Sequence, residues 1–145
     1  MEKIPKKIHY CWFGNNEKSE LVRKCIESWK INLPDYEIIE WNESNFDIKI
    51  NKYVENAYKD KKWAFVSDYV RLYALYSHGG IYLDTDMEVI KNLDDFLDNE
   101  VFIGCETEET INGAIIGSKK GNRFIYEIMN NYENNLSKEY NTIPT

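Results

Sequence analysis

Two aspartates one residue apart, Asp84 and Asp86, follow a short apolar segment and could bind a metal ion. The apolar segment, residues 79–83, opens with a double glycine. Because side chains alternate along a strand, Tyr82 and both aspartates share one face, and the aliphatic residues take the other. Mg²⁺ and Mn²⁺ prefer carboxylate oxygens, and they commonly share one or two protein carboxylates with substrate phosphates. The pattern favours a site for a metal-bound diphosphate. A chance pair remains an alternative in a chain with 25 acidic residues.

The segment just upstream, residues 62–78, contains no Gly or Pro and is apolar on most sides. This composition predicts a buried helix that ends at Gly79. Ser67, Asp68 and Arg71 are its polar exceptions, and their spacing puts Arg71 on the same face as the other two. A buried Asp–Arg pair can simply neutralise its own charges, and that alternative stays open. Since the helix leads directly into the acidic strand, we expect Asp68 and Arg71 to lie near the aspartates. There the planar guanidinium would suit a diphosphate or sugar hydroxyls.

Together these segments resemble the signature of the DXD sugar-binding glycosyltransferases. This group includes bacterial capsular-polysaccharide transferases, yeast-type initiating α-1,6-mannosyltransferases and the catalytic domains of large clostridial glucosylating toxins. Residues 4–14 resemble their first strand, and residues 112–118 resemble the segment after their acidic strand, so the resemblance extends from residue 4 to about residue 132. The matching pattern is Ser67-Asp68-x-x-Arg71 followed by Gly79-Gly80-x-Tyr82-Leu83-Asp84-x-Asp86.

The resemblance implies a role for each matching residue. Trp12 would stack on the nucleotide base and Tyr82 would lie against the ribose or base, although both could be ordinary core aromatics. Asp84 would contact the sugar and ribose, and Asp86 would bind the Mn²⁺ or Mg²⁺ that bridges the diphosphate. The expected sets are Asp84, Asp86 and Arg71 for catalysis, Trp12, Ser67, Asp68, Arg71, Tyr82 and Asp84 for the donor, Asp86 and Asp84 for the metal, and Asn112 on the acceptor side.

The reaction expected from this resemblance is the transfer of a hexose from UDP- or GDP-hexose to a saccharide or a lipid-linked saccharide, as in the synthesis of cell-surface or capsular polysaccharide. A metal and a cation would stabilise the anionic diphosphate that leaves. Similar enzymes retain the anomeric configuration. A nucleophile, if there is one, would come from Asp84, Glu106, Glu108 or a nearby side-chain amide, and the sequence does not choose among them.

Length and composition limit the classes of protein to which this chain can belong. A length of 145 residues supports one domain, residues 1–145, with its own core. The formal net charge of −7 argues against nucleic-acid binding. An acidic chain also needs a local cation to hold a diphosphate. The aromatic content of 14% fits base and sugar stacking, although core packing could account for much of it.

Cysteine usage and hydropathy predict a cytoplasmic protein. Cys11, Cys25 and Cys105 form no spaced framework, and we expect all three to be reduced core residues. His9 and His78 are expected to be structural. No signal peptide and no apolar run of transmembrane length is visible, so any membrane association would be peripheral, near a membrane-linked acceptor.

Strands and helices are expected to alternate along the chain, as in an α/β fold with a mostly parallel central sheet and helices on both faces. Ligands of such sheets bind beyond the carboxyl ends of the strands. The resemblance makes this fold the nucleotide-sugar-binding type called GT-A. In the first helix, Leu21 is expected on the buried face together with Val22, Cys25, Ile26 and Trp29. We expect strands at 8–13, 36–41, 81–83, 101–105 and 113–118, helices at 19–33, 52–60, 62–78 and 121–132, and a helical turn at 93–97.

Similar transferases continue for roughly another hundred residues that complete the acceptor site, so we expect this chain to hold the donor-binding part of a C-terminally truncated domain. Two alternatives follow. The chain could be a nucleotide-sugar-binding module without turnover. It could also be an Asp-x-Asp phosphohydrolase, but Glu88 stands where those motifs usually have Thr, and their later Lys and Asp motifs are not recognisable.

Overall fold

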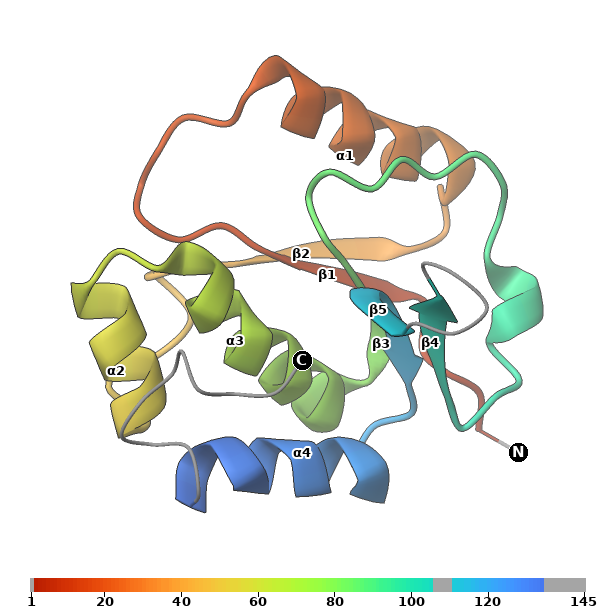
Figure 1. Ribbon diagram of the computed structural model, residues 1–145. Helices are drawn as coiled ribbons and strands as arrows, with labels where there is room; N and C mark the ends of the chain where they lie inside the picture. Colours follow the sequence, from red (N-terminus) through yellow and green to blue (C-terminus); the bar gives the residue numbers. More distant parts are fainter. Residues whose placement is uncertain (1, 106–110, 135–145) are drawn as a thin grey trace.

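A five-stranded sheet forms the centre of the computed structural model, which describes residues 2–105 and 111–134 (Figure 1). The elements follow one another in the order expected from the sequence, with bounds shifted by a few residues. They are β1 (Lys7–Cys11), α1 (Glu20–Asn32), β2 (Glu37–Trp41), α2 (Lys52–Lys59), α3 (Trp63–His78), β3 (Gly80–Leu83), the 3₁₀ turn η1 (Asp94–Phe96), β4 (Val101–Cys105), β5 (Ile111–Ser118) and α4 (Arg123–Asn134).

The strand order is β2-β1-β3-β5-β4. Strand β1 pairs in parallel with β2 and β3, whereas β5 runs antiparallel to both β3 and β4. Four of the described strands therefore point the same way, and β5 alone is reversed. The carboxyl ends of β1, β2 and β3 consequently meet at one edge of the sheet, where a ligand site is expected.

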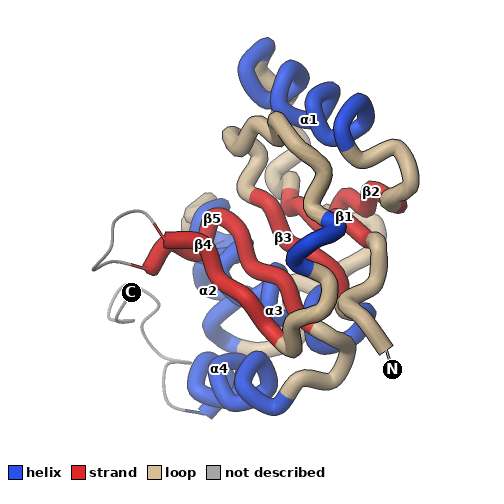
Figure 2. The backbone as a smooth tube through the Cα atoms, turned by 90° about the vertical axis from the view of Figure 1, so that its right-hand side faces the viewer, coloured by secondary structure: helices blue, strands red, loops and turns tan. Residues whose placement is uncertain are grey.

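Helices cover both faces of the sheet, as the alternation predicted. Helix α1 lies over one face, and α2, α3 and α4 lie over the other (Figures 1 and 2). The alternation of side chains in β1 divides the core accordingly. Ile8 and Tyr10 pack on the α1 side, whereas Cys11 packs on the α3 side. In the described part of the chain, no helix is both long and apolar enough to cross a membrane.

The short strand β3 is buried on both faces. Ile81 and Leu83 belong to the α1-side core, and Tyr82, only 3% exposed, belongs to the α3-side core. The predicted alternation is thus observed, but the face that carries Tyr82 is as completely buried as the aliphatic face. Strands in the centre of a parallel sheet are typically enclosed in this way. The strand emerges from the core only where the aspartates begin.

Helix α1 buries a narrower stripe than expected. Val22, Cys25, Ile26 and Trp29 are buried at the i, i+3, i+4 and i+7 spacing of one helical face. Leu21 was expected on this face, and that prediction is wrong, because the residue is 60% exposed. The four buried residues already fill the contact with the sheet, and Leu21 falls outside the stripe.

Candidate active site

A cavity of about 510 Å³ opens at the carboxyl ends of β1 and β3, beside the first half of α3. Its volume is within the range of pockets that enclose small ligands. Its walls come from three separate parts of the chain, which fold together only because the strands are parallel neighbours. The residues predicted from sequence that line it are Trp12, Ser67, Asp68, Arg71, Tyr82, Asp84 and Asp86.

The double glycine that precedes the acidic strand allows a tight turn between α3 and β3. Gly79 and Gly80 both have positive φ, at 71° and 124°. A Cβ on Gly80 would lie 2.6 Å from the carbonyl oxygen of Lys7 in β1, and a Cβ on Gly79 would lie 2.7 Å from a backbone nitrogen. Only glycine fits these positions, because an L side chain would be both strained and obstructed. The glycines therefore allow β3 to pair closely with β1.

His9 fixes this turn from inside the sheet, in the structural role expected from the sequence. It is fully buried, and the indole N–H of Trp41 donates to its Nδ1 at 3.0 Å. Its Nε2 must then carry the proton, and it donates to the carbonyl oxygen of Gly79 at 2.8 Å. Burial lowers the pKa of His9 to about 4, so the ring is neutral near pH 7.

The two aspartates lie where β3 leaves the core. The backbone N–H of Asp84 still donates to the carbonyl oxygen of Ala114 in β5 at 2.9 Å. The hydroxyl of Tyr82 donates to Oδ1 of Asp84 at 2.8 Å, and burial raises the pKa of Tyr82 well above its usual value. The hydroxyl therefore keeps its proton and orients the carboxylate. Asp84 is partly buried, whereas Asp86 is exposed on the loop beyond it.

Helix α1 holds the loop that carries Asp86. The indole N–H of Trp29 donates to the carbonyl oxygen of Met87 at 2.7 Å. The backbone N–H of Val89 donates to Oγ of Ser28 at 2.9 Å, and the side-chain amide of Asn32 donates to the carbonyl oxygen of Val89 at 2.7 Å. Three hydrogen bonds thus anchor the loop within three residues of Asp86. This anchoring reduces the freedom that a metal ligand would lose on binding.

Helix α3 supplies the basic side chain of the cavity. Nη2 of Arg71 lies 3.2 Å from Oδ1 of Asp68, and its guanidinium carbon lies 5.8 Å from the centre of the Tyr82 ring. Burial raises the pKa of Asp68; the Arg71 charge opposes that rise, and the nearby Asp84 charge adds to it. The predicted proximity of Asp68 and Arg71 to the acidic strand is therefore observed.

Two tryptophans face the cavity from different elements. Trp12 follows β1, and its backbone N–H donates to the carbonyl oxygen of Trp41 at 2.8 Å. Trp63, in the first turn of α3, was not predicted as a site residue. A Cβ on Gly14 would lie 2.7 Å from the Trp63 ring, so glycine lets that ring pack against the backbone. The signal that could have identified Trp63 is its spacing, because it lies four residues before Ser67 on the same helical face.

The cavity carries an excess of negative charge. Its described lining includes the carboxylates of Glu17, Asp68, Asp84 and Asp86 but only one basic side chain, Arg71. A diphosphate would not enter such a field without a cation. Among the described residues, no group of three or more His, Cys, Asp or Glu side chains gathers to hold a metal. The donor set fits Mg²⁺ or Mn²⁺ in its usual diphosphate arrangement, in which one or two carboxylates are completed by phosphate oxygens and water.

The remaining predicted residues are Asn112, Glu106, Glu108 and the cysteines. Asn112 lies in β5 and its backbone pairs with Gly104, but its side chain, like Glu106 and Glu108, lies outside the described residues. Cys11 is a free thiol that lines the cavity, and burial raises its pKa to about 12, so it carries no nucleophilic thiolate at neutral pH. Cys25 is also free and buried, as expected.

Comparison with known families gives the cavity its context. The family model described as "Glycosyltransferase sugar-binding region containing DXD motif" matches residues 19–103, more than half of the chain. The chain belongs to this DXD glycosyltransferase family. The matched range includes Asp68 and Arg71 of α3 and both aspartates of the acidic strand end, all of which line the cavity.

Curated relatives of this DXD protein are longer than the chain itself. Inositol phosphoceramide mannosyltransferase 3 of Schizosaccharomyces pombe is 27% identical over 139 residues, which are 88% of this chain and 37% of the relative. An uncharacterised glycosyltransferase of Acanthamoeba polyphaga mimivirus is 37% identical over 103 residues, which are 65% of this chain and 40% of the relative. The chain thus spans less than half the length of either relative.

Solved structures show the same fold. The PaToxG glycosyltransferase superposes with a TM-score of 0.76 at 23% identity, covering 96% of this chain and 65% of that one. The UDP-bound glycosyltransferase domain of the YGT toxin superposes with a TM-score of 0.66 at 12% identity, covering 90% of this chain and 61% of that one. The fold of the DXD protein is therefore of the GT-A type, as the sequence predicted.

Proposed function

We propose that this chain binds a nucleoside diphosphate hexose together with Mn²⁺ or Mg²⁺ and transfers the hexose to a saccharide or lipid-linked saccharide acceptor, with retention of the anomeric configuration. The observation that carries the proposal is the convergence of Trp12, Arg71 and the Asp84–Asp86 pair on one cavity from three separate elements. A stacking surface, a fixed cation and a pair of carboxylates are what a base, a diphosphate and its metal require.

Each wall of the cavity has its part in the proposal. The base stacks on Trp12 at the end of β1, and Tyr82 lies below the ribose. Ser67 and Asp68 form hydrogen bonds with sugar hydroxyls, with the Asp68 carboxylate as acceptor, and Arg71 donates to the hexose or the diphosphate. The Arg71 charge also stabilises the negative charge that develops on the departing diphosphate.

Asp84 and Asp86 would hold the metal. A divalent ion bound there would act as a Lewis acid on the diphosphate leaving group. One oxygen of Asp84 accepts a hydrogen bond from Tyr82, which orients the carboxylate and leaves its second oxygen for the metal. Asp86, on the anchored loop, contributes an exposed carboxylate that a metal ion can reach from solvent.

The nucleotide, the sugar and the setting are the finer parts of the proposal. The relatives point to different donors, since one is named a mannosyltransferase and one neighbour is a UDP-bound domain, so UDP- and GDP-hexoses are both candidates. A polysaccharide-assembly role in the cytoplasm, with peripheral contact to a membrane-linked acceptor, follows from the family resemblance. The acceptor side, including Asn112, forms part of the same proposal.

Donor turnover tests the activity. The purified chain is incubated with UDP-glucose, UDP-galactose, UDP-N-acetylglucosamine and GDP-mannose with Mn²⁺, and release of UDP or GDP is followed by chromatography. We expect slow, metal-dependent release from one nucleotide class, lost in Asp86→Asn and retained in the control Asp95→Asn, which alters an exposed carboxylate of η1.

Other outcomes identify the alternatives. Nucleotide binding without any release, even with saccharide acceptors added, would support the binding module. Hydrolysis of an aryl phosphate, with no release from any nucleotide sugar, would support the phosphohydrolase and refute the proposed function.

A further inference from the structure

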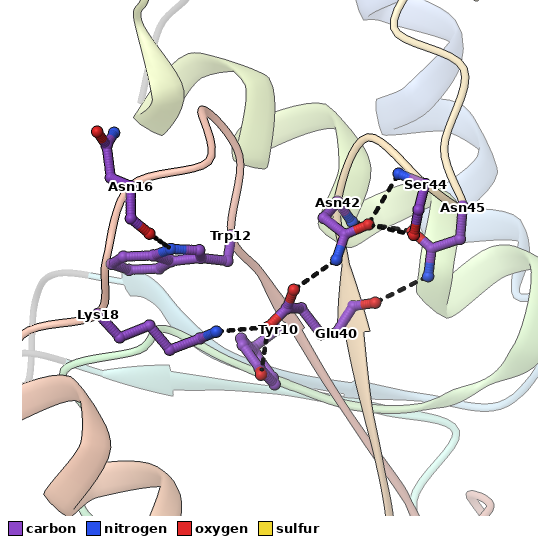
Figure 3. Close-up of polar contacts among 8 residues, drawn as sticks. All are labelled: Tyr10, Trp12, Asn16, Lys18, Glu40, Asn42, Ser44 and Asn45. Carbon is purple, nitrogen blue, oxygen red and sulfur yellow. Dashed lines mark hydrogen bonds and ion pairs between the residues drawn. The ribbon is translucent and has the colours of Figure 1, made fainter.

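A cluster of polar side chains lies next to Trp12 (Figure 3), and its members Tyr10, Lys18, Glu40 and Asn42 are not among the residues that line the cavity. Nζ of Lys18 lies 2.8 Å from Oε1 of Glu40, and the hydroxyl of Tyr10 donates to the same oxygen at 2.7 Å. The amide of Asn42 donates to the other oxygen of Glu40. The side chains of Lys18 and Glu40 are only 28% and 27% exposed, so this ion pair is partly shielded from water. It is not a typical surface pair, which contributes little.

The cluster reaches Trp12 through Lys18. The ammonium nitrogen lies 5.6 Å from the centre of the Trp12 ring, within the range of a cation–π interaction. The indole N–H donates to the carbonyl oxygen of Asn16 at 2.7 Å. Trp12 therefore has its polar edge occupied and one face next to a cation. Lys18 itself does not line the cavity, although its neighbours Glu17 and Ser19 do.

The cluster also has the charges that this arrangement needs. Burial raises the pKa of Glu40, but hydrogen bonds from Lys18, Tyr10 and Asn42 outweigh it and hold the pKa below its usual value. Glu40 is therefore ionised at neutral pH and holds the ammonium in place. Tyr10 is in β1 and Glu40 is in β2, and these strands pair with each other. The ion pair with Glu40 therefore fixes Lys18 to two neighbouring strands of the sheet. The loop between β1 and α1, which forms one wall of the cavity, is thereby attached to the sheet.

We propose that Lys18 is a positioning residue of the donor site, which holds the Trp12 ring in the orientation that stacks on the nucleotide base. The inference rests on the proposed function, because it assumes that a base occupies the free face of Trp12. In the absence of Lys18 the indole would keep its bond to Asn16 but could tilt about it. Nucleotide binding would then have to order the ring, at a cost to affinity.

A double-mutant cycle tests this role. The dissociation constants of UDP and GDP are measured by calorimetry with Mn²⁺ for the parent, Lys18→Met, Trp12→Ala and the double variant. Methionine keeps the apolar stem and removes the charge. We expect Lys18→Met to weaken binding of the preferred nucleotide about fivefold. In the Trp12→Ala background the same change should alter binding less than twofold, because Lys18 acts through Trp12.

Two further variants separate positioning from a general structural effect. Lys18→Arg, which keeps a cation able to stack and to pair with Glu40, should restore binding to within twofold of the parent. Lys24→Met removes an exposed lysine of α1, whose side chain is 73% exposed, and should change nothing. If Lys18→Met does not fold, Glu40→Gln replaces it, since the loss of that charge should weaken binding by a similar factor.

The outcomes are distinct. Parent-like binding by Lys18→Met, or an equal loss in the presence and absence of Trp12, would overturn the inference and leave the proposed function standing. No binding of either nucleotide by the parent chain would overturn both.

Discussion

The hydrogen bond between Tyr82 and Asp84 gives a prediction that couples stability to donor binding. Tyr82→Phe removes one buried hydroxyl and leaves the ring, so the aromatic packing of the core is kept. A hydrogen bond to an ionised acceptor contributes about 1.5–3 kcal/mol. Because Asp84 is partly exposed, water can replace the lost donor, which favours the low end of that range. We expect the free energy of unfolding to fall by about 1.5 kcal/mol and the midpoint of thermal unfolding to fall by about 4 °C.

The assay is urea denaturation at pH 7, followed by tryptophan fluorescence, on Tyr82→Phe, Asp84→Asn and the double variant. The coupling energy of the cycle should be about 1 kcal/mol or more, since the two groups contact each other. Tyr126→Phe on α4 is the control, because this residue is 48% exposed, and the change should cost less than about 0.5 kcal/mol. Nucleotide affinity with Mn²⁺ should also fall, because the carboxylate is no longer oriented. Additive effects in the cycle, or a loss no larger than that of the control, would refute the role of this bond.

Three further predictions concern the turn and the cavity. Gly80→Ala should cost more than about 3 kcal/mol, because its Cβ would meet the Lys7 carbonyl. Gly121→Ala, with φ of 73° and nothing within 4 Å, should cost only about 1 kcal/mol, and equal losses in thermal denaturation would contradict the steric argument. Between pH 6.5 and 4 the unfolded state binds more protons at His9 than the folded state. The free energy of unfolding should therefore decrease as the pH is lowered through this window, by up to about 3 kcal/mol from this residue. Denaturation of His9→Gln should show a shallower pH dependence over that window, and an unchanged slope would contradict the buried neutral ring. Asp68→Asn should weaken donor binding while costing less than about 1 kcal/mol of stability, because burial already disfavours the ionised carboxylate; a large loss of stability in urea titration would show that its pair with Arg71 is structural.

Much of the fold was predictable because periodic patterns carry it. The alternation in β3 and the apolar character of α3 set which side chains are buried, and the double glycine set where the helix ends. These local signals placed Arg71 and the aspartates together, since only one turn separates the helix from the strand. The reversal of β5 was not predicted, because strand direction depends on which neighbour a segment pairs with and not on its own pattern.

Contacts between distant segments were less accessible from sequence. The ion pair of Lys18 with Glu40 joins residues 22 apart, and neither residue stands out in a chain rich in charge. Trp63 was interpreted only as part of a buried helix. Its spacing from Ser67 puts it on the helical face of the site, but the room that Gly14 leaves for its ring comes from a distant segment. Leu21 was misplaced because a helical stripe read from sequence is wider than the one the sheet can cover.

Calorimetric titration of the chain with UDP and with GDP, each with Mn²⁺ and with EDTA, tests the metal–diphosphate site most directly when it is repeated on Asp86→Asn and Asp95→Asn. We expect one nucleotide to bind with Mn²⁺, EDTA and Asp86→Asn each to abolish binding, and Asp95→Asn to bind as the parent does. Binding that persists unchanged in EDTA and in Asp86→Asn would contradict the assignment of the acidic strand end as a metal–diphosphate site.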